Sequence, residues 1–290
     1  MNLTTAIESE TLHEPVIHAA ATVVADELRP PRPAWVSVQQ ARRMDPLAAL
    51  AAAAVDRLPR AALIPMSAIV VGTAWGSVTS TLGFMDGIAH WGDAAGSPAS
   101  FTTSVHHHTA GVLAELLTLH GPPATISCGA TSGLAALRWA QVMVASGRAP
   151  SALVVAVDLP TTWSRRVAGD LSQCPFPIGG GATALVLTRG GNGWRIARPG
   201  TVPPKLIVDA GGATAAEEAI WARRGGKVRR TSVSQHGVWW PTAALGGVPW
   251  MATQPVLVRE FSDGIASEVL LIPPDLPLEH PRVLTETVSP

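Results

Sequence analysis

The fold of this chain follows from the stretch Thr125-Ile126-Ser127-Cys128-Gly129-Ala130-Thr131-Ser132-Gly133-Leu134-Ala135-Ala136-Leu137. Thr125 to Ser127 is typical of the end of a buried strand, and Cys128 to Ser132 is a run of small residues. Leu134 and Leu137 then open an apolar pattern at helical spacing. We therefore predict a strand, a tight elbow and a helix that enters the core. Such elbows present a nucleophile at a helix N-terminus, where free N–H groups and the helix dipole favour an anion.

This elbow resembles that of the β-ketoacyl synthases, which belong to the thiolase-like superfamily. In that family the segment reads Thr-Ile-x-Thr-Ala-Cys-x-Ser-Gly or a close variant. Aligned without a gap, this chain keeps Thr125, Ile126, Ser132 and Gly133. Ala130 stands where the family has its acyl-accepting cysteine. The resemblance therefore implies an elbow without its nucleophile.

The cysteine of this elbow, Cys128, stands two residues earlier than the family's. A side chain displaced by two positions points elsewhere, and nucleophilic attack needs reacting atoms about 3–3.5 Å apart in the right orientation. We interpret Cys128 as a small residue buried at the strand end, because free cysteine is commonly buried. A relocated nucleophile is the alternative.

The bulk composition indicates a well-packed chain with no nucleic-acid surface. Of its 290 residues, 47% are hydrophobic and 14% are charged, and Lys+Arg and Asp+Glu both number 21. The length suits one large domain or two fused halves, whereas nucleic-acid binding would need a basic excess. The two cysteines, Cys128 and Cys174, have neither metal nor disulfide spacing, which fits a reducing cytoplasm.

Neither export nor membrane insertion is expected from the sequence. Met1 to Glu14 is polar and acidic, unlike a signal peptide. The most apolar run, Leu47 to Val55, is too short to span a bilayer. We therefore expect a cytoplasmic protein.

The rest of the chain alternates predicted strands and helices. Strands are predicted at 16–24 (or a short buried segment there), 67–72 and 152–158, at the end of 176–187, at the start of 205–214, and within 256–272. Helices are predicted at 41–58 and within 102–119, and loops at 73–80 and 97–101. The resemblance spans most of residues 15–272 and implies a thiolase-like α/β fold.

That fold is layered α-β-α-β-α and is built from two related halves. We expect residues 1–190 to form the N-terminal ketosynthase-like half, which carries the degenerate elbow. Residues 191–290 are expected to form a C-terminal half that is shorter than the family usually has. The two halves would make one compact unit.

The family's catalysis needs more than the thiol. Two histidines help to decarboxylate malonyl-carrier protein and stabilise the resulting charge, and the resemblance places them at Gly211 and Ala243. Side chains such as those of Ala130, Gly211 and Ala243 have no ionisable or nucleophilic group, so they cannot do acid–base or covalent work. We expect no catalytic residue, no cofactor and no metal in this chain.

Non-catalytic members of the family are known as chain length factors. They pair with an active ketosynthase in type II polyketide and polyene systems of antibiotic biosynthesis, as a heterodimer or within a higher-order assembly. They meet the acyl carrier protein through that complex, and their side chains cap the acyl tunnel at the interface. The resemblance implies this role here, which is steric control rather than chemistry.

Five residues are candidates for the tunnel wall or the subunit interface: Trp75, Thr79, Leu82, Phe101 and His107. For Trp75, Thr79 and Leu82, and for Phe84 beside them, the alternative is that they fill the chain's own core. His106 to His108 resembles a metal site, but consecutive side chains point in different directions and rarely share one ion. We therefore assign His107 to the interface and not to a metal.

Two further functions stay open at this point. The chain could be an acyltransferase or thioesterase-like enzyme that uses Cys128, or a homodimeric protein that binds acyl chains. A thioester on Cys128 would mark the first, and a homodimer without any partner would mark the second.

Overall fold

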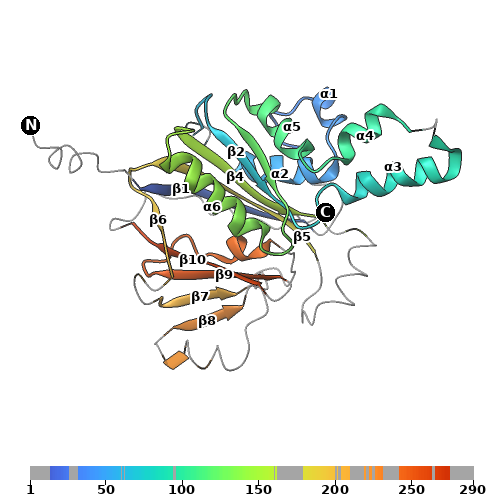
Figure 1. Cartoon of the computed structure of the whole chain (residues 1–290). Helices are drawn as coiled ribbons and strands as arrows, with labels where there is room; N and C mark the ends of the chain where they lie inside the picture. Colours follow the sequence, from blue (N-terminus) through green and yellow to red (C-terminus); the bar gives the residue numbers. More distant parts are fainter. Residues whose placement is uncertain are drawn as a thin grey trace, which may run out of the picture.

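The structure is a computed structural model. It describes residues 14–25, 32–59, 61, 63–93, 96–159, 161, 179–199, 201, 204–209, 219, 222–223, 226–230, 242–262 and 265–274. Figure 1 shows the arrangement of its elements. The strands are β1 (Pro15–Ala25), β2 (Ala68–Gly72), β3 (Pro123–Ile126), β4 (Ser151–Asp158), β5 (Gly180–Arg189), β6 (Trp194–Ala197), β7 (Leu206–Asp209), β8 (Lys227–Arg230), β9 (Val256–Ser262) and β10 (Ile265–Ile272). The helices are α1 (Val38–Ala41), α2 (Pro46–Asp56), α3 (Val78–Trp91), α4 (Pro98–Ser104), α5 (His108–Leu117), α6 (Ser132–Ala145) and the 3-10 helix η3 (Ala243–Gly247).

The strand order repeats itself and so divides the chain into two related halves. The sheet runs β3-β2-β4-β5-β1-β6-β10-β9-β7-β8. In the first half β2 is parallel to β3 and β4, while β5 is antiparallel to β4 and β1. In the second half β7 is parallel to β8 and β9, while β10 is antiparallel to β9 and β6. Counted from the outer edge of the sheet inward, each half places its strands in the same order: its third, second, fourth, fifth and first strand. This repeat is what we predicted for a duplicated fold.

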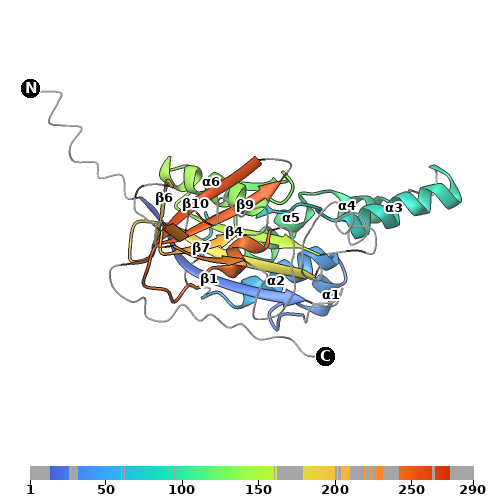
Figure 2. The same ribbon diagram turned by 90° about the horizontal axis from the view of Figure 1, so that it is seen from below.

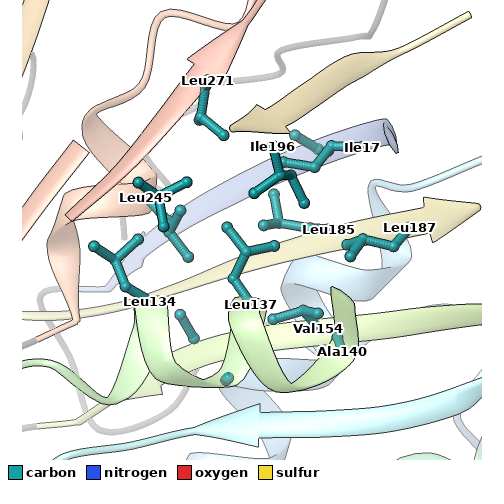
Figure 3. Close-up of a cluster of buried hydrophobic side chains, with 14 of the residues drawn as sticks. Ile17, Leu134, Leu137, Ala140, Val154, Leu185, Leu187, Ile196, Leu245 and Leu271 are labelled. Atoms are coloured by element: carbon teal, nitrogen blue, oxygen red, sulfur yellow. The ribbon is translucent and has the colours of Figure 1, made fainter. Parts of the chain in front are cut away.

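The main hydrophobic core lies between the halves, around α6. Leu134 and Leu137 of α6 share one cluster with Leu185 of β5 and with Leu245 and Leu271 of the second half, and Figure 3 shows these side chains converging. A second cluster lies on the other face of the first-half strands, where α2 and α5 cover them. The layers are therefore α2 and α5, the first-half strands, α6, and the second-half strands.

The predicted shortening of the second half falls on its outer layer. In the first half α1 and α2 occupy the connection from β1 to β2. The equivalent connection, from β6 to β7, comprises only residues 198–205, which is too few for a covering helix. The described residues of this connection accordingly include no helix.

Two predicted boundaries are wrong for local reasons. The single helix predicted at 41–58 is two helices, because Asp45 caps α2 by accepting a hydrogen bond from the Ala48 N–H and Pro46 starts the helix. The loop predicted at 97–101 is instead the start of α4, with Ser97 as its N-cap and Pro98 in its first turn. In both cases a proline stands in the first turn of a helix, where its missing N–H costs nothing. Pro46 starts a helix inside the predicted helix, and Pro98 starts one inside the predicted loop.

The elbow strand is also less buried than predicted. β3 pairs only with β2 and forms one edge of the sheet. Its residues are exposed or half-buried, not buried. The apolar run at β3 therefore forms an edge strand and not a central one. The backbone groups on its outer side are open to pairing with another chain.

α3 and α4 form an arm that projects from the body of the molecule, as Figures 1 and 2 both show. No residue of either helix is buried. Phe84 and Phe101 hold the two helices together, with ring centroids 5.7 Å apart.

Candidate functional site at the elbow

The elbow is closed by its own small polar side chains. Gly129 takes a left-handed φ of 62°, which a larger residue would adopt only with strain. The Ser132 hydroxyl donates to the Gly129 carbonyl at 2.6 Å and accepts from the Cys128 N–H at 2.9 Å. The Thr131 hydroxyl donates to the Cys128 carbonyl at 2.8 Å. α6 begins at Ser132, so the strand, elbow and helix follow each other as predicted.

Ala130 and Cys128 lie on this turn, in different settings. Ala130 is half-buried two residues before α6, and it carries only a methyl group. Cys128 is exposed in the single chain, so the prediction that it is buried is wrong. Its position explains the difference, because it follows the edge strand β3 rather than a central strand.

The second-half positions differ in how far the structure describes them. Ala243 opens η3 and is fully buried. Its neighbour Thr242, also fully buried, sends its hydroxyl toward the first half and donates to Asp158 at 2.9 Å. Gly211, the other predicted position, lies outside the described residues.

Asp158, at the end of β4, collects four hydrogen bonds behind the elbow. Its Oδ1 accepts from the Thr73 hydroxyl at 2.9 Å, from the Ala74 N–H at 2.8 Å and from the Trp75 N–H at 3.1 Å. Its Oδ2 accepts from Thr242. Burial nevertheless raises the pKa of Asp158 to about 6, because desolvation of the carboxylate outweighs these bonds.

Glu260 of β9 reaches the same place from the second half. Its Oε2 accepts from the Leu134 N–H, in the first turn of α6, at 2.7 Å. Burial raises the pKa of Glu260 well above its usual range, and the charge of Asp158 raises it further. Sequence reasoning missed both acids. The available signal was a carboxylate that follows an apolar run within a strand: Asp158 follows Ala152 to Val157, and Glu260 follows Val256 to Val258 and Arg259.

The tunnel and interface candidates fall into three places. Thr79 and Leu82 lie on α3, and Phe101 lies on α4 against it. Trp75, half-buried, belongs to the loop that Asp158 holds. His107 is exposed and lies at the N-cap of α5. None of the five is buried, so the alternative that they fill the chain's own core is wrong.

Two features are absent from the part of the chain that the structure describes. Within it no three His, Cys, Asp or Glu side chains gather as a metal site would require. Nor does it contain a helix with the length and apolar character needed to cross a membrane.

The comparisons with known proteins place the chain in a family. The family model described as "Beta-ketoacyl synthase, N-terminal domain" matches residues 8–231. The chain therefore belongs to the β-ketoacyl synthase family, as its elbow indicated. No curated protein matches the sequence significantly.

Solved structures share the fold at low identity. One titled "The ishigamide ketosynthase/chain length factor" is 16% identical, with a TM-score of 0.62 over 89% of this chain and 98% of that chain. The ketosynthase ApeO in complex with its chain length factor ApeC from Xenorhabdus doucetiae is 16% identical, with a TM-score of 0.51 over 74% and 92%. A type II polyketide synthase acyl-carrier protein in complex with its ketosynthase, AntDE:AntF, is 13% identical, with a TM-score of 0.65 over 89% and 98%. They confirm the thiolase-like fold of this chain.

Proposed function

We propose that this chain is a non-catalytic subunit of the chain length factor kind, which pairs with an active ketosynthase. The observation that carries the proposal is the methyl group of Ala130 at the N-terminus of α6, where the family's chemistry needs a thiol. Ala243 likewise offers no proton donor. The two acids behind the elbow, Asp158 and Glu260, are fully buried and hydrogen-bonded to the backbone, which suits them to structure rather than to turnover.

The arm and the edge strand support a partner subunit. Leu82, Met85, Trp91 and Phe101 of α3 and α4 are all exposed large hydrophobic residues. Apolar patches of this kind mark protein interfaces, and a stable interface removes on the order of 1,600 Å² from water. β3 adds an unpaired sheet edge beside the elbow. The active ketosynthase is the partner that the titles of the similar complexes suggest.

A role in setting the length of the product would follow from the position of the arm in such a complex. Trp75, Thr79, Leu82 and Phe101 would face the partner's acyl tunnel and limit the length of the chain that grows in it. The acyl carrier protein would be met through the complex, in a type II polyketide or polyene system in the cytoplasm. Larger side chains at these positions would stop elongation earlier, and smaller ones would allow longer products.

Co-expression with a ketosynthase encoded beside this chain tests the proposal. We expect a one-to-one complex by solution mass, and elongation only when both subunits are present. Elongation by this chain alone, or a stable homodimer that ignores the ketosynthase, would contradict it.

Met85→Asp is expected to prevent that complex from forming. Met85 is 56% exposed on α3, and a carboxylate placed in an apolar interface is costly to desolvate. Met251→Asp is the matched control, since Met251 is 59% exposed but lies in the second half, away from the arm. Co-purification through a tag on the partner measures both variants. If both variants lose co-purification equally, or if neither variant loses it, the result argues against the arm as the interface.

Cys128→Ala is expected to leave elongation by the complex unchanged. Cys128 lies on the turn but two residues from the nucleophile position, and only the Thr131 hydroxyl approaches its sulfur, at 3.5 Å, among the described residues. Mass spectrometry after incubation with an acyl carrier protein gives a second readout. A thioester on Cys128, lost in the variant together with activity, would favour the acyltransferase or thioesterase-like alternative.

A further inference from the structure

We propose that Asp158 and Glu260 form a protonated carboxyl latch, one acid from each half of the chain, which holds the elbow and the 73–77 loop in place and weakens when its proton is lost. The latch is separate from any chemistry at the elbow. It fastens two segments of the first half to β9 and η3 of the second half.

Each acid holds a different first-half segment. Glu260 binds the Leu134 N–H and so anchors the first turn of α6 to β9. Asp158 binds the loop before α3 through the Thr73 hydroxyl and two backbone N–H groups. The Thr242 hydroxyl of the second half donates to Asp158 and so links that acid to the start of η3. The same cluster therefore spans both halves.

The contact between Glu260 and the elbow is close. A Cβ built on Gly133 would lie 2.6 Å from Glu260 Oε1, 3.3 Å from Ala156 Cβ and 3.4 Å from Thr242 Cβ. Glycine is needed at position 133 because any side chain there would displace the acid. Thr242 thus lies beside both carboxyl groups, which are fully buried.

The charge around the pair favours a bound proton. Glu260 Oε1 has no hydrogen-bond partner in the described part of the chain, and a bare carboxylate oxygen in a dry interior is costly. Within the part of the chain that the structure describes, no basic side chain is among the groups that act on either acid. The charge of an ionised Asp158 disfavours ionisation of Glu260, since like charges repel each other.

The remaining charged groups of these strands lie on the opposite face of the sheet. Arg259 precedes Glu260 on β9, so its side chain points the other way. There it lies 3.5 Å from Glu268 of β10, and in register with Asp209 of β7. α6, η3 and the 73–77 loop bring no titratable side chain against the pair, because their contacts are Leu134, Thr242, Thr73 and backbone N–H groups. Among the described residues, the pair's own proton is therefore the charge that we expect to control the latch.

The latch has one consequence that rests on the proposed function. The segments that the latch holds contain the elbow and Trp75. Trp75 lies in the loop that leads into α3, the first helix of the arm. Loosening the latch would therefore loosen the base of the surface that meets the partner subunit.

The test compares Glu260→Gln with Glu260→Ala in the full chain between pH 5 and pH 9. Gln resembles the protonated acid and has no proton to lose. We therefore expect the ratio of the wild-type unfolding constant to that of Glu260→Gln to rise on the order of ten-fold or more from pH 5 to pH 9. Glu260→Ala should be destabilised at every pH, because the Leu134 N–H loses its acceptor. Glu115→Gln, on the exposed surface of α5, is the control and should follow wild type.

Hydrogen exchange supplies a second readout, which applies equally to the chain purified with its partner. After correction for intrinsic rates, protection of residues 129–137 should fall at alkaline pH in wild type and persist in Glu260→Gln. A wild-type profile parallel to that of Glu260→Gln, or equal destabilisation by Gln and Ala, would overturn the latch. Neither result bears on whether the chain pairs with a ketosynthase, since that is read from co-purification alone.

Discussion

Leu137→Ala is expected to lower the free energy of unfolding by about 3 kcal/mol, within the range of about 2–5 kcal/mol for buried leucines. Leu137 is fully buried on α6, in the cluster that joins the two halves. Its removal takes contacts from both halves at once, because Leu185 lies on one side and Leu245 and Leu271 on the other. Urea unfolding of the purified chain measures the change.

Val142→Ala is the control for that experiment. Val142 lies on the same helix but is 55% exposed, so its truncation should change the free energy of unfolding by less than about 0.5 kcal/mol. A loss at Leu137 as small as the loss at Val142 would mean that α6 is not the shared core of the two halves.

Asp158 is expected to make the protein less stable as the pH rises from about 4 to about 6. The pKa of this carboxyl is 3.8 in its ordinary state and about 6 when folded. A group whose pKa is raised by folding stabilises the fold fully below its unfolded pKa, and this contribution is lost as the pH passes its folded pKa. A difference of about two pKa units corresponds to about 3 kcal/mol.

Asp158→Asn isolates that effect. Asn keeps an acceptor for Thr73, Ala74 and Trp75 and has no charge to desolvate, so the free energy of unfolding of wild type relative to the variant should fall by about 3 kcal/mol between pH 4 and pH 7. Asp158→Ala should instead be destabilised at all pH values, because two hydroxyls and two N–H groups lose their acceptor. If wild type instead gains stability relative to Asp158→Asn as the pH rises, folding does not raise the pKa of Asp158, and the buried acid is ionised without cost.

Much of the fold could be predicted from local pattern. The apolar runs that became β1, β2 and β4 and the pattern of α6 are visible in the sequence, because buried strands and core helices need apolar side chains at fixed spacing. The boundaries at Pro46 and Pro98 were wrong, since the helix start that each proline marks lay inside a longer predicted element, a helix at Pro46 and a loop at Pro98. The edge position of β3 could not be predicted, because it depends on which strands lie beside it.

The candidate site, like the fold, could be predicted from the sequence only in part. Ala130 is identified by its place in the elbow pattern, and Ala243 by its place before Leu245 and Gly246. The buried pair is different, because Asp158 and Glu260 are 102 residues apart (260 − 158) in the sequence and come together only when β4 and β9 approach α6 from opposite sides.

The sequence by itself determined the family, the duplicated α/β fold and the place of Ala130 in the elbow, since these depend on residue types at local spacing. Only the tertiary structure decided that Cys128 is exposed, that α3 and α4 form an apolar arm, and that two acids meet behind the elbow. Each of these is a matter of burial, which depends on contacts between distant segments. Local pattern contains the residues of such a site, but only folding creates the environment that sets their protonation and their role.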